Sequence, residues 1–158
     1  MQKKMRLYEN KMTVQKIYFD GQIIDKDDEI NARQGQLIID GALCNDSVQK
    51  EGQEIGDPTE IALVNFSEKH DLPVEKMREK YQRLGEIPFD SDRKLMSTVH
   101  KIGGNYKMLT KGAVDVLSGR INEVKTMDGK RPFTAEELAE LKKVNTEFSQ
   151  MGLRVLAV

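Results

Sequence analysis

The stretch "KLMSTVHKIGGNYKMLTK", residues 94–111, decides the fold. Polar and apolar residues alternate in "KLMSTVHKI", which is typical of a strand with one buried face. Gly103-Gly104-Asn105 then supplies residues that tolerate the positive φ values of a tight turn, and "YKMLTK" resumes the strand composition. The sequence therefore predicts a β-hairpin here and an antiparallel sheet around it.

Further strands are indicated on both sides of this hairpin. "TVQKIYFDGQ" (13–22) is rich in β-forming residues before the turn signal Asp20-Gly21. "INEVKTM" (121–127) leads into Asp128-Gly129, and "LRVLAV" (153–158) is predicted to be a last, buried strand.

The segment "GDPTEIALVNFSEKH" (56–70) has the signals of a helix N-terminus. Asp57 is a good N-cap, and Pro58 suits the first helical position. Glu60 follows the cap by three residues, which is a capping-box arrangement. We expect a helix after Asp57.

Other helices follow from the same signals. Pro73 begins a second helix, and a short one follows Lys111-Gly112-Ala113 and ends at Leu117. A long fourth helix is capped by Thr134 and Glu137 and ends at Gly152. The apolar faces expected of the second and fourth helices consist of Val74, Met77, Tyr81 and Leu84, and of Leu138, Leu141, Phe148 and Met151. Because strands and helices do not alternate strictly, the fold class is α+β, a mostly antiparallel twisted sheet flanked by helices.

Composition limits the possible functions. A chain of 158 residues with a net charge of −1 suits one domain without a broad basic surface, so neither nucleic acid nor direct membrane contact is expected. The single cysteine, Cys44, rules out an intramolecular disulfide framework and is expected in the core. No apolar run approaches the roughly 18 residues of a membrane span, so we expect a soluble chain.

The usual catalytic and metal-binding signatures are absent. No glycine-rich phosphate loop, H-E-x-x-H or G-x-S-x-G pattern occurs, and Cys44, His70 and His100 are too few for a zinc site or a Cys/His dyad. The acidic run "DKDDE" (25–29) is a solvated loop or a helix entry or, less in keeping with its pattern, a calcium site. Asp90-Ser91-Asp92 either caps a turn and pairs with the neighbouring bases or holds magnesium beside a phosphate.

Five segments taken together resemble a known family. They are "ALCNDS" (42–47), "GDPTEIAL" (56–63), "IPFDSDRKLMSTV" (87–99), "LTKGAVDVL" (109–117) and "GLRVLAV" (152–158). In this order they are similar to the signature set of the nucleotide-binding domain of type II P-type ATPases, with bacterial calcium pumps the best match. "ENKMTVQKIY" (9–18) extends the resemblance, because it is similar to the strand that follows the phosphorylation motif. The resemblance implies the α+β fold of that domain and a parent hydrolase and translocase that transports a cation, with calcium expected.

Departures from the family pattern matter as well. Where the family carries D-K-T-G-T-L-T, with the aspartate that accepts the phosphoryl group, this chain has "QKKMRLY" (2–8). Gln2 cannot form an acyl phosphate, so we expect residues 1–8 to be added or linker residues. We expect residues 1–158 to be a single nucleotide-binding domain, excised from a pump, that does not turn over ATP alone. Ser91 stands where some calcium pumps have an arginine, so no phosphate contact is transferred to it.

The resemblance implies a set of nucleotide-binding residues. Taken by themselves, Phe89 would be a core residue and Lys94 or Lys111 a solvated lysine. By resemblance, Phe89 stacks on adenine and Lys94 lies along the phosphates. Lys111 lies at the back of the adenine pocket, and Gly112 allows close approach of the backbone to the ligand. The implied set also contains Glu60 at the adenine amino group, Thr59 beside it, Met96, and Arg154 at the ribose or phosphates, with no catalytic and no metal-ligating residue.

The implied ligand is ATP, with Mg²⁺ carried by the nucleotide. One stack and a few partly exposed polar contacts predict weak binding, roughly millimolar to tens of micromolar. The implied partners are the phosphorylation and membrane domains of the pump, with the chain a monomer in the cytoplasm. A stand-alone regulatory nucleotide sensor and a protein-interaction domain remain as alternatives.

Overall fold

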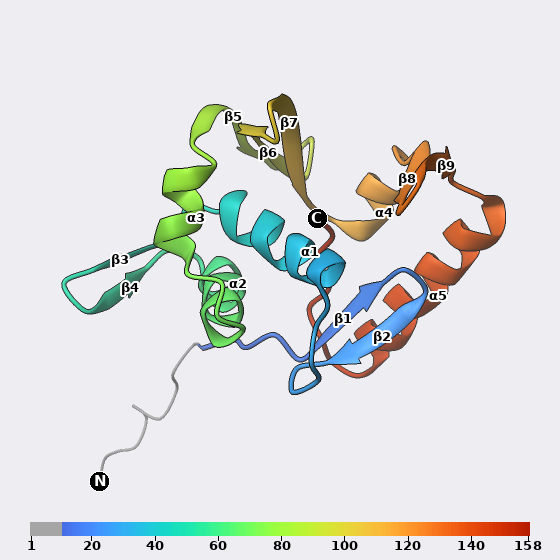
Figure 1. Ribbon diagram of the computed structural model, residues 1–158. Coiled ribbons are helices and arrows are strands. Elements are labelled where there is room, and N and C mark those ends of the chain that lie inside the picture. Colours follow the sequence, from blue (N-terminus) through green and yellow to red (C-terminus); the bar gives the residue numbers. More distant parts are fainter. Residues whose placement is uncertain (1–10) are drawn as a thin grey trace, which may run out of the picture.

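The hairpin expected at residues 94–111 forms two strands of a three-stranded antiparallel sheet. The structure, a computed structural model, describes residues 11–158 (Figure 1). The strands of this sheet are β5 (Arg83–Asp90), β6 (Leu95–Ile102) and β7 (Asn105–Gly112). Gly103 and Gly104 adopt positive φ angles of 61° and 82° in the turn. The hairpin prediction is confirmed, whereas the predictions for residues 1–8, Gln2 included, lie outside the described residues.

The remaining described strands form three separate two-stranded sheets. These are β1 (Lys16–Phe19) with β2 (Gln22–Asp25), β3 (Val48–Lys50) with β4 (Gln53–Ile55), and β8 (Glu123–Thr126) with β9 (Gly129–Pro132). All pair antiparallel. The α+β class and the antiparallel pairing are therefore confirmed, with the strands divided among four sheets because each pairs with its neighbour in sequence.

The segment "LRVLAV" is not an extended strand, so that prediction is wrong. Only Ala157 pairs with β7, through two hydrogen bonds of 2.9 Å with Gly112. The edge of β7 cannot pair further because the chain turns into a helix directly after Ala113. The C-terminal segment is thus joined to the sheet at one position.

Residues 11–158 form five helices. They are α1 (Ala32–Leu43), α2 (Pro58–Lys69), α3 (Val74–Lys80), α4 (Val114–Ser118) and α5 (Ala135–Gln150). The sequence reasoning allowed a helix entry at residues 25–29 but gave no bounds for α1, although its capping box was present as Asn31 and Gln34. The Asn31 side chain accepts from the Gln34 N–H at 2.9 Å, and the Gln34 side chain accepts from the Asn31 N–H at 2.9 Å.

Three helix predictions need correction. The Asp57 side chain caps α2 through the Thr59 N–H at 2.8 Å, but Glu60 does not complete a capping box, because its carboxylate is engaged elsewhere. The helix after Pro73 ends at Lys80, so Leu84 lies in β5 and is exposed. On α5 the capping box of Thr134 and Glu137 is confirmed, whereas Met151 is exposed because it lies beyond the last helical turn.

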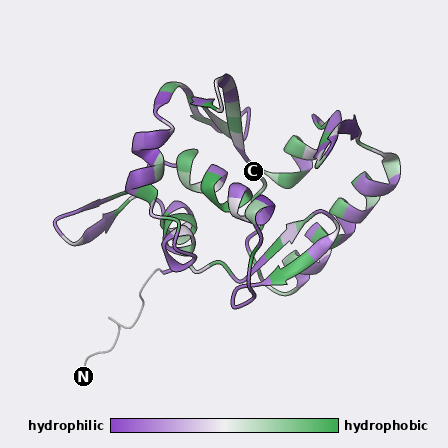
Figure 2. Cartoon of the chain, viewed as in Figure 1, coloured by the Kyte–Doolittle hydropathy of each residue, from purple (hydrophilic) through white to green (hydrophobic). Residues whose placement is uncertain are grey.

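The core lies around α1, which is central in Figure 1. This helix packs against α2, α3 and β7, while α4 contacts both α5 and β7. Ala42, Val64 and Val74 form a buried cluster where α1, α2 and α3 meet, and Cys44 is fully buried as predicted. Figure 2 shows that hydrophilic residues dominate the protruding β3–β4 hairpin. Among the described helices none combines the length and the apolar composition of a membrane span.

Candidate functional site

A nearly buried ion pair lies between α2 and β7. The ammonium Nζ of Lys111 lies 2.6 Å from Oε2 of Glu60, and the two side chains are 7% and 16% exposed. The N–H of Asp46 donates to the same Oε2 at 3.0 Å. Within residues 11–158 no group donates to Oε1 of Glu60. Two predicted site residues, Glu60 and Lys111, therefore form an ion pair with each other although they are far apart in sequence. Oε1 of Glu60 can still accept a hydrogen bond.

The β5–β6 connection brings Lys94 to the end of the same sheet. Lys94 adopts a left-handed conformation with φ 61°, and its N–H donates to the Asp90 carbonyl at 2.6 Å. The Asp90 carboxylate accepts from the Asp92 N–H at 2.7 Å, so the D-x-D segment caps a turn. Neither aspartate forms an ion pair with Arg93 or Lys94 within the described part of the chain. The Lys94 side chain is exposed.

Arg93 braces this turn from inside. Its guanidinium donates to the Leu95 carbonyl at 2.8 Å, to the Ile87 carbonyl at 3.3 Å and to the Ser97 hydroxyl at 3.2 Å. These bonds tie the two strands that flank the turn. Arg93 thus supports the turn and does not point its guanidinium to solvent.

Phe89 lies at the end of β5 with its side chain largely uncovered. The residue is 63% exposed, which excludes the core position that its residue type suggested. The pairing of β5 with β6 shifts register between Ile87 and Asp90, so the strand is irregular where Phe89 occurs. An exposed ring beside the Lys94 turn is therefore available to a flat ligand.

Gly112 brings the end of β7 against the start of β6. A Cβ atom built on Gly112 would lie 2.3 Å from the Lys94 carbonyl oxygen and 2.6 Å from Cδ2 of Leu95. Only glycine permits this approach without a shift. The same residue pairs with Ala157, which belongs to the segment that carries the exposed Arg154. Lys94, Gly112 and the C-terminal segment thus meet at one end of the sheet.

Met96 and Thr59 take different positions in the predicted set. Met96 is buried and lies opposite Lys111 in the β6–β7 register. Thr59 is half-buried in the first turn of α2, and its hydroxyl lies 3.6 Å from Sδ of Met12. Met96 is therefore the cross-strand neighbour of Lys111, whereas the Thr59 hydroxyl is directed to Met12.

A separate cavity of about 460 Å³ lies among α1, α2, α4, α5, β1 and the C-terminal segment. Its walls are mainly aliphatic and aromatic side chains, including Leu63, Phe66 and Phe148. Of the eight predicted nucleotide residues, only Thr59 and Arg154 line it. This cavity is therefore distinct from the cluster around Lys111 and Lys94.

Three other chemically capable side chains, Cys44, His100 and Asp27, are engaged in contacts within the fold. Burial raises the pKa of the Cys44 thiol, which donates weakly to the Met96 and Leu109 carbonyls at 3.6 and 3.5 Å. His100 is buried and hydrogen-bonded through both ring nitrogens. Asp27 pairs with Lys69 at 2.9 Å. Within residues 11–158, no group of three or more His, Cys, Asp or Glu side chains is placed to hold a metal ion.

The sequence reasoning gave no role to the residues that contact Glu60 from the 42–47 segment or that hold this segment. These are Asn45 and Asp46 of the quoted "ALCNDS" motif, together with two arginines, Arg78 and Arg83, that bind the carbonyls of this motif. Their positions in the chain carry no pattern that predicts such contacts.

A family model and the similar curated proteins all point to the same family of proteins. The family model described as "P-type ATPase, cytoplasmic domain N" matches residues 33–158. The chain is 47% identical over 156 residues to a calcium-transporting ATPase of Listeria monocytogenes, a match that covers 96% of this chain and 18% of that protein. Calcium-transporting ATPases of Lactococcus lactis and Bacillus cereus are 43% and 34% identical over 154 residues, each covering 96% of this chain and 17% of the relative. The chain thus spans less than a fifth of the length of these relatives.

Proposed function

This chain belongs to the P-type ATPase family, as its cytoplasmic domain N, and from that premise we propose that it binds ATP and positions it for phosphoryl transfer. The acceptor would be an aspartate of a separate phosphorylation domain. In this proposal residues 1–158 are one nucleotide-binding domain, and the parent pump transports calcium. The observation that carries the proposal is the grouping of Phe89, Lys94 and the Glu60–Lys111 pair at one end of the β5–β7 sheet.

The chemistry of these groups suits a purine nucleotide. An exposed aromatic ring can stack on adenine, for which about 1–3 kcal/mol is typical. The free Oε1 of Glu60 can accept a hydrogen bond from the adenine amino group, while Oε2 pairs with the Lys111 ammonium at 2.6 Å. The exposed ammonium of Lys94 and the guanidinium of Arg154 can attract phosphates.

Weak binding fits delivery of the nucleotide. A stack and partly exposed polar contacts leave about 4–6 kcal/mol after the ligand is immobilised, or roughly millimolar to tens of micromolar Kd. In this proposal Mg²⁺ enters with the nucleotide, and the remaining contacts to the phosphates come from the phosphorylation domain after a hinge motion.

An amide NMR titration with ATP tests the proposal. We expect saturable shifts at Glu60, Phe89, Lys94, Lys111 and Arg154, with and without Mg²⁺. Phe89→Ala should weaken binding by roughly 5- to 150-fold, which corresponds to the loss of about 1–3 kcal/mol of stacking. Tyr106→Ala is the matched control, because Tyr106 is 72% exposed on the same sheet but lies away from the Lys94 turn.

Two results would contradict the proposal. One is a spectrum that does not change at millimolar ATP. The other is a saturable response that Phe89→Ala and Tyr106→Ala reduce equally, because this would remove the assigned role of the Phe89 ring.

A further inference from the structure

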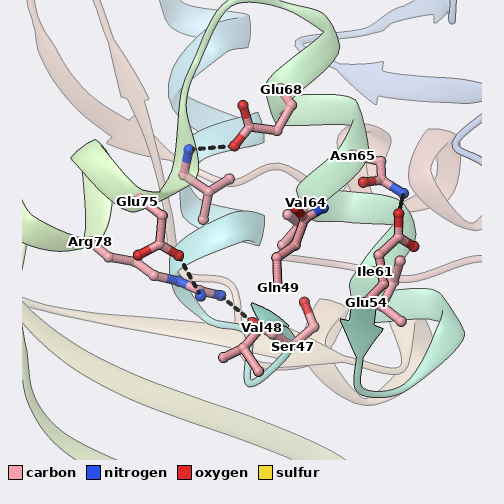
Figure 3. A pocket seen from close by; sticks show the side chains of 11 residues that line it. Ser47, Val48, Gln49, Glu54, Ile61, Val64, Asn65, Glu68, Glu75 and Arg78 are labelled. Atoms are coloured by element: carbon pink, nitrogen blue, oxygen red, sulfur yellow. Dashed lines mark hydrogen bonds and ion pairs between the residues drawn. The ribbon is translucent and has the colours of Figure 1, made fainter. Parts of the chain in front are cut away.

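Two arginines hold the loop that connects α1 to β3. Arg83 of β5 donates to the Asp46 carboxylate at 2.8 Å, to the Asn45 carbonyl at 2.9 Å and to the Leu43 carbonyl at 3.3 Å. Arg78 of α3 donates to the Ser47 carbonyl at 2.8 Å and lies 3.6 Å from the Glu75 carboxylate (Figure 3). Residues 43–47 are therefore tied to two different elements through their carbonyl groups.

The inner side of this loop is held as well. Asn45 is 1% exposed, and its amide donates to the Glu60 carbonyl at 2.9 Å and the Gly41 carbonyl at 3.3 Å. The side-chain oxygen Oδ1 of Asn45 accepts from the Ser47 N–H at 2.9 Å and from the Ser47 hydroxyl at 2.7 Å. A buried polar group with all these bonds made fixes the backbone around it.

The N–H of Asp46 projects from this fixed loop to the Glu60 carboxylate. It donates to Oε2 at 3.0 Å, the same oxygen that Lys111 contacts at 2.6 Å. Two donors on one oxygen set the rotation of the carboxylate and leave Oε1 for another donor. If the loop moved, the carboxylate could turn both of its oxygens to Lys111.

We infer that Arg83 is a positioning residue which, through the backbone of Asp46, orients Glu60 so that the site selects a purine with an amino group at its 6-position. This inference rests on the proposed nucleotide binding. ATP presents an amino donor at that position, whereas ITP presents a carbonyl oxygen, which an oriented carboxylate oxygen repels. Arg83 itself touches neither the base nor Glu60.

The test compares Arg83→Gln with Arg33→Gln in the 158-residue chain. Arg33 is a matched control because it also binds a carboxylate and a carbonyl, Asp20 at 3.5 Å and Lys125 at 3.0 Å, but far from Glu60. The readouts are the Asp46 amide proton shift and the ratio of ITP to ATP dissociation constants. We expect Arg83→Gln to move the Asp46 amide proton upfield and to lower the ratio of the ITP to the ATP dissociation constant by about fivefold or more. Arg83→Lys should restore part of the amide shift and part of the ratio.

Asp46→Asn provides a milder variant in case Arg83→Gln does not fold. It removes the carboxylate that Arg83 binds but keeps the Asp46 N–H, so both readouts should change in the same direction by less. An unchanged ratio in folded Arg83→Gln, or equal losses of ATP and ITP binding, would show that Arg83 only supports the fold and would overturn the inference.

The failure of nucleotide binding itself can be recognised separately. If the unmodified chain binds neither ATP nor ITP, the proposed function is wrong, but the Asp46 amide still reports on positioning. Movement of this amide in Arg83→Gln and not in Arg33→Gln then supports the positioning role, and an unmoved amide overturns it.

Discussion

Lys111 and Glu60 are 51 residues apart in sequence, yet their side chains form a contact of 2.6 Å that is almost closed to solvent. Removing one member of a buried pair leaves the other charge without compensation, which typically costs about 3–5 kcal/mol. We therefore expect Glu60→Gln to lower the free energy of unfolding by an amount in this range, measured by urea denaturation.

Two further variants distinguish charge burial from loss of packing. The double variant Glu60→Gln/Lys111→Met should be less destabilised than the sum of the single variants, because no unpaired ammonium remains. Lys69→Met removes an exposed pair, whose side chains are 48% and 76% exposed, and should cost much less stability than Glu60→Gln. Equal losses in Glu60→Gln and Lys69→Met would contradict this account.

Gly112→Ala should be strongly destabilising. The added Cβ would lie 2.3 Å from the Lys94 carbonyl oxygen, which belongs to the backbone and cannot rotate away. Overpacking of this kind costs about 1–3 kcal/mol, and we expect a lower melting temperature. Gly41→Ala is the control, because its added Cβ meets only side-chain atoms at 3.7 Å or more. A Gly112→Ala protein as stable as Gly41→Ala would contradict the close approach.

Lys94 should separate stability from nucleotide binding. Its left-handed backbone, with φ 61°, costs a non-glycine residue about 1–2 kcal/mol. Lys94→Gly and Lys94→Ala both remove the ammonium, so both should weaken ATP binding to a similar extent. Thermal denaturation should show Lys94→Gly as the more stable variant by about 1 kcal/mol. If the two variants bound ATP with clearly different affinities, the backbone conformation and not the charge would decide binding.

The capping box of α5 should make stability depend on pH. A hydrogen bond from Arg131, with further bonds from Thr134, lowers the pKa of Glu137 from 4.5 to about 2. Because the folded-state pKa lies below the unfolded one, the carboxylate stabilises the fold above pH 4.5, and this contribution is lost as the pH falls toward 2. The difference in melting temperature between the unmodified chain and Glu137→Gln should therefore be largest near pH 6 and vanish near pH 2.

Glu136→Gln serves as the control for this pH dependence. Glu136 is in the same helical turn but is not hydrogen-bonded to Arg131. Its substitution should change the melting temperature less over the same pH range. A Glu137→Gln effect that stays constant from pH 6 to pH 2 would contradict the role of the ionised carboxylate.

Local sequence signals predicted the elements whose stability is local. The 94–111 hairpin, the caps at Asp57 and Thr134, and the turns at Asp20-Gly21 and Asp128-Gly129 all depend on residues within a few positions of each other. The exposure of Phe89 was not predictable from its residue type, and the register shift between Ile87 and Asp90, where Phe89 lies, carries no signal in the sequence.

The pairing of Glu60 with Lys111 shows where sequence reasoning stops. Glu60 has the spacing of a capping-box residue, but its carboxylate binds the Lys111 ammonium and the N–H of Asp46 in place of the N–H of the cap residue Asp57. Such long-range contacts leave no periodicity in the sequence. The family resemblance indicated that both residues matter, whereas only the structure shows that they bind each other.

The division of the strands into four sheets has a consequence for folding. Every ladder in residues 11–158 joins strands that are consecutive in the chain, so each closes a loop of only a few residues. Low contact order of this kind favours rapid folding, because little chain entropy is lost before a ladder forms. The two hydrogen bonds between Gly112 and Ala157 are the exception, since they close a loop of more than forty residues. Closing this junction therefore costs more chain entropy than closing any of the ladders, and it is made beside Lys111 at the end of β7.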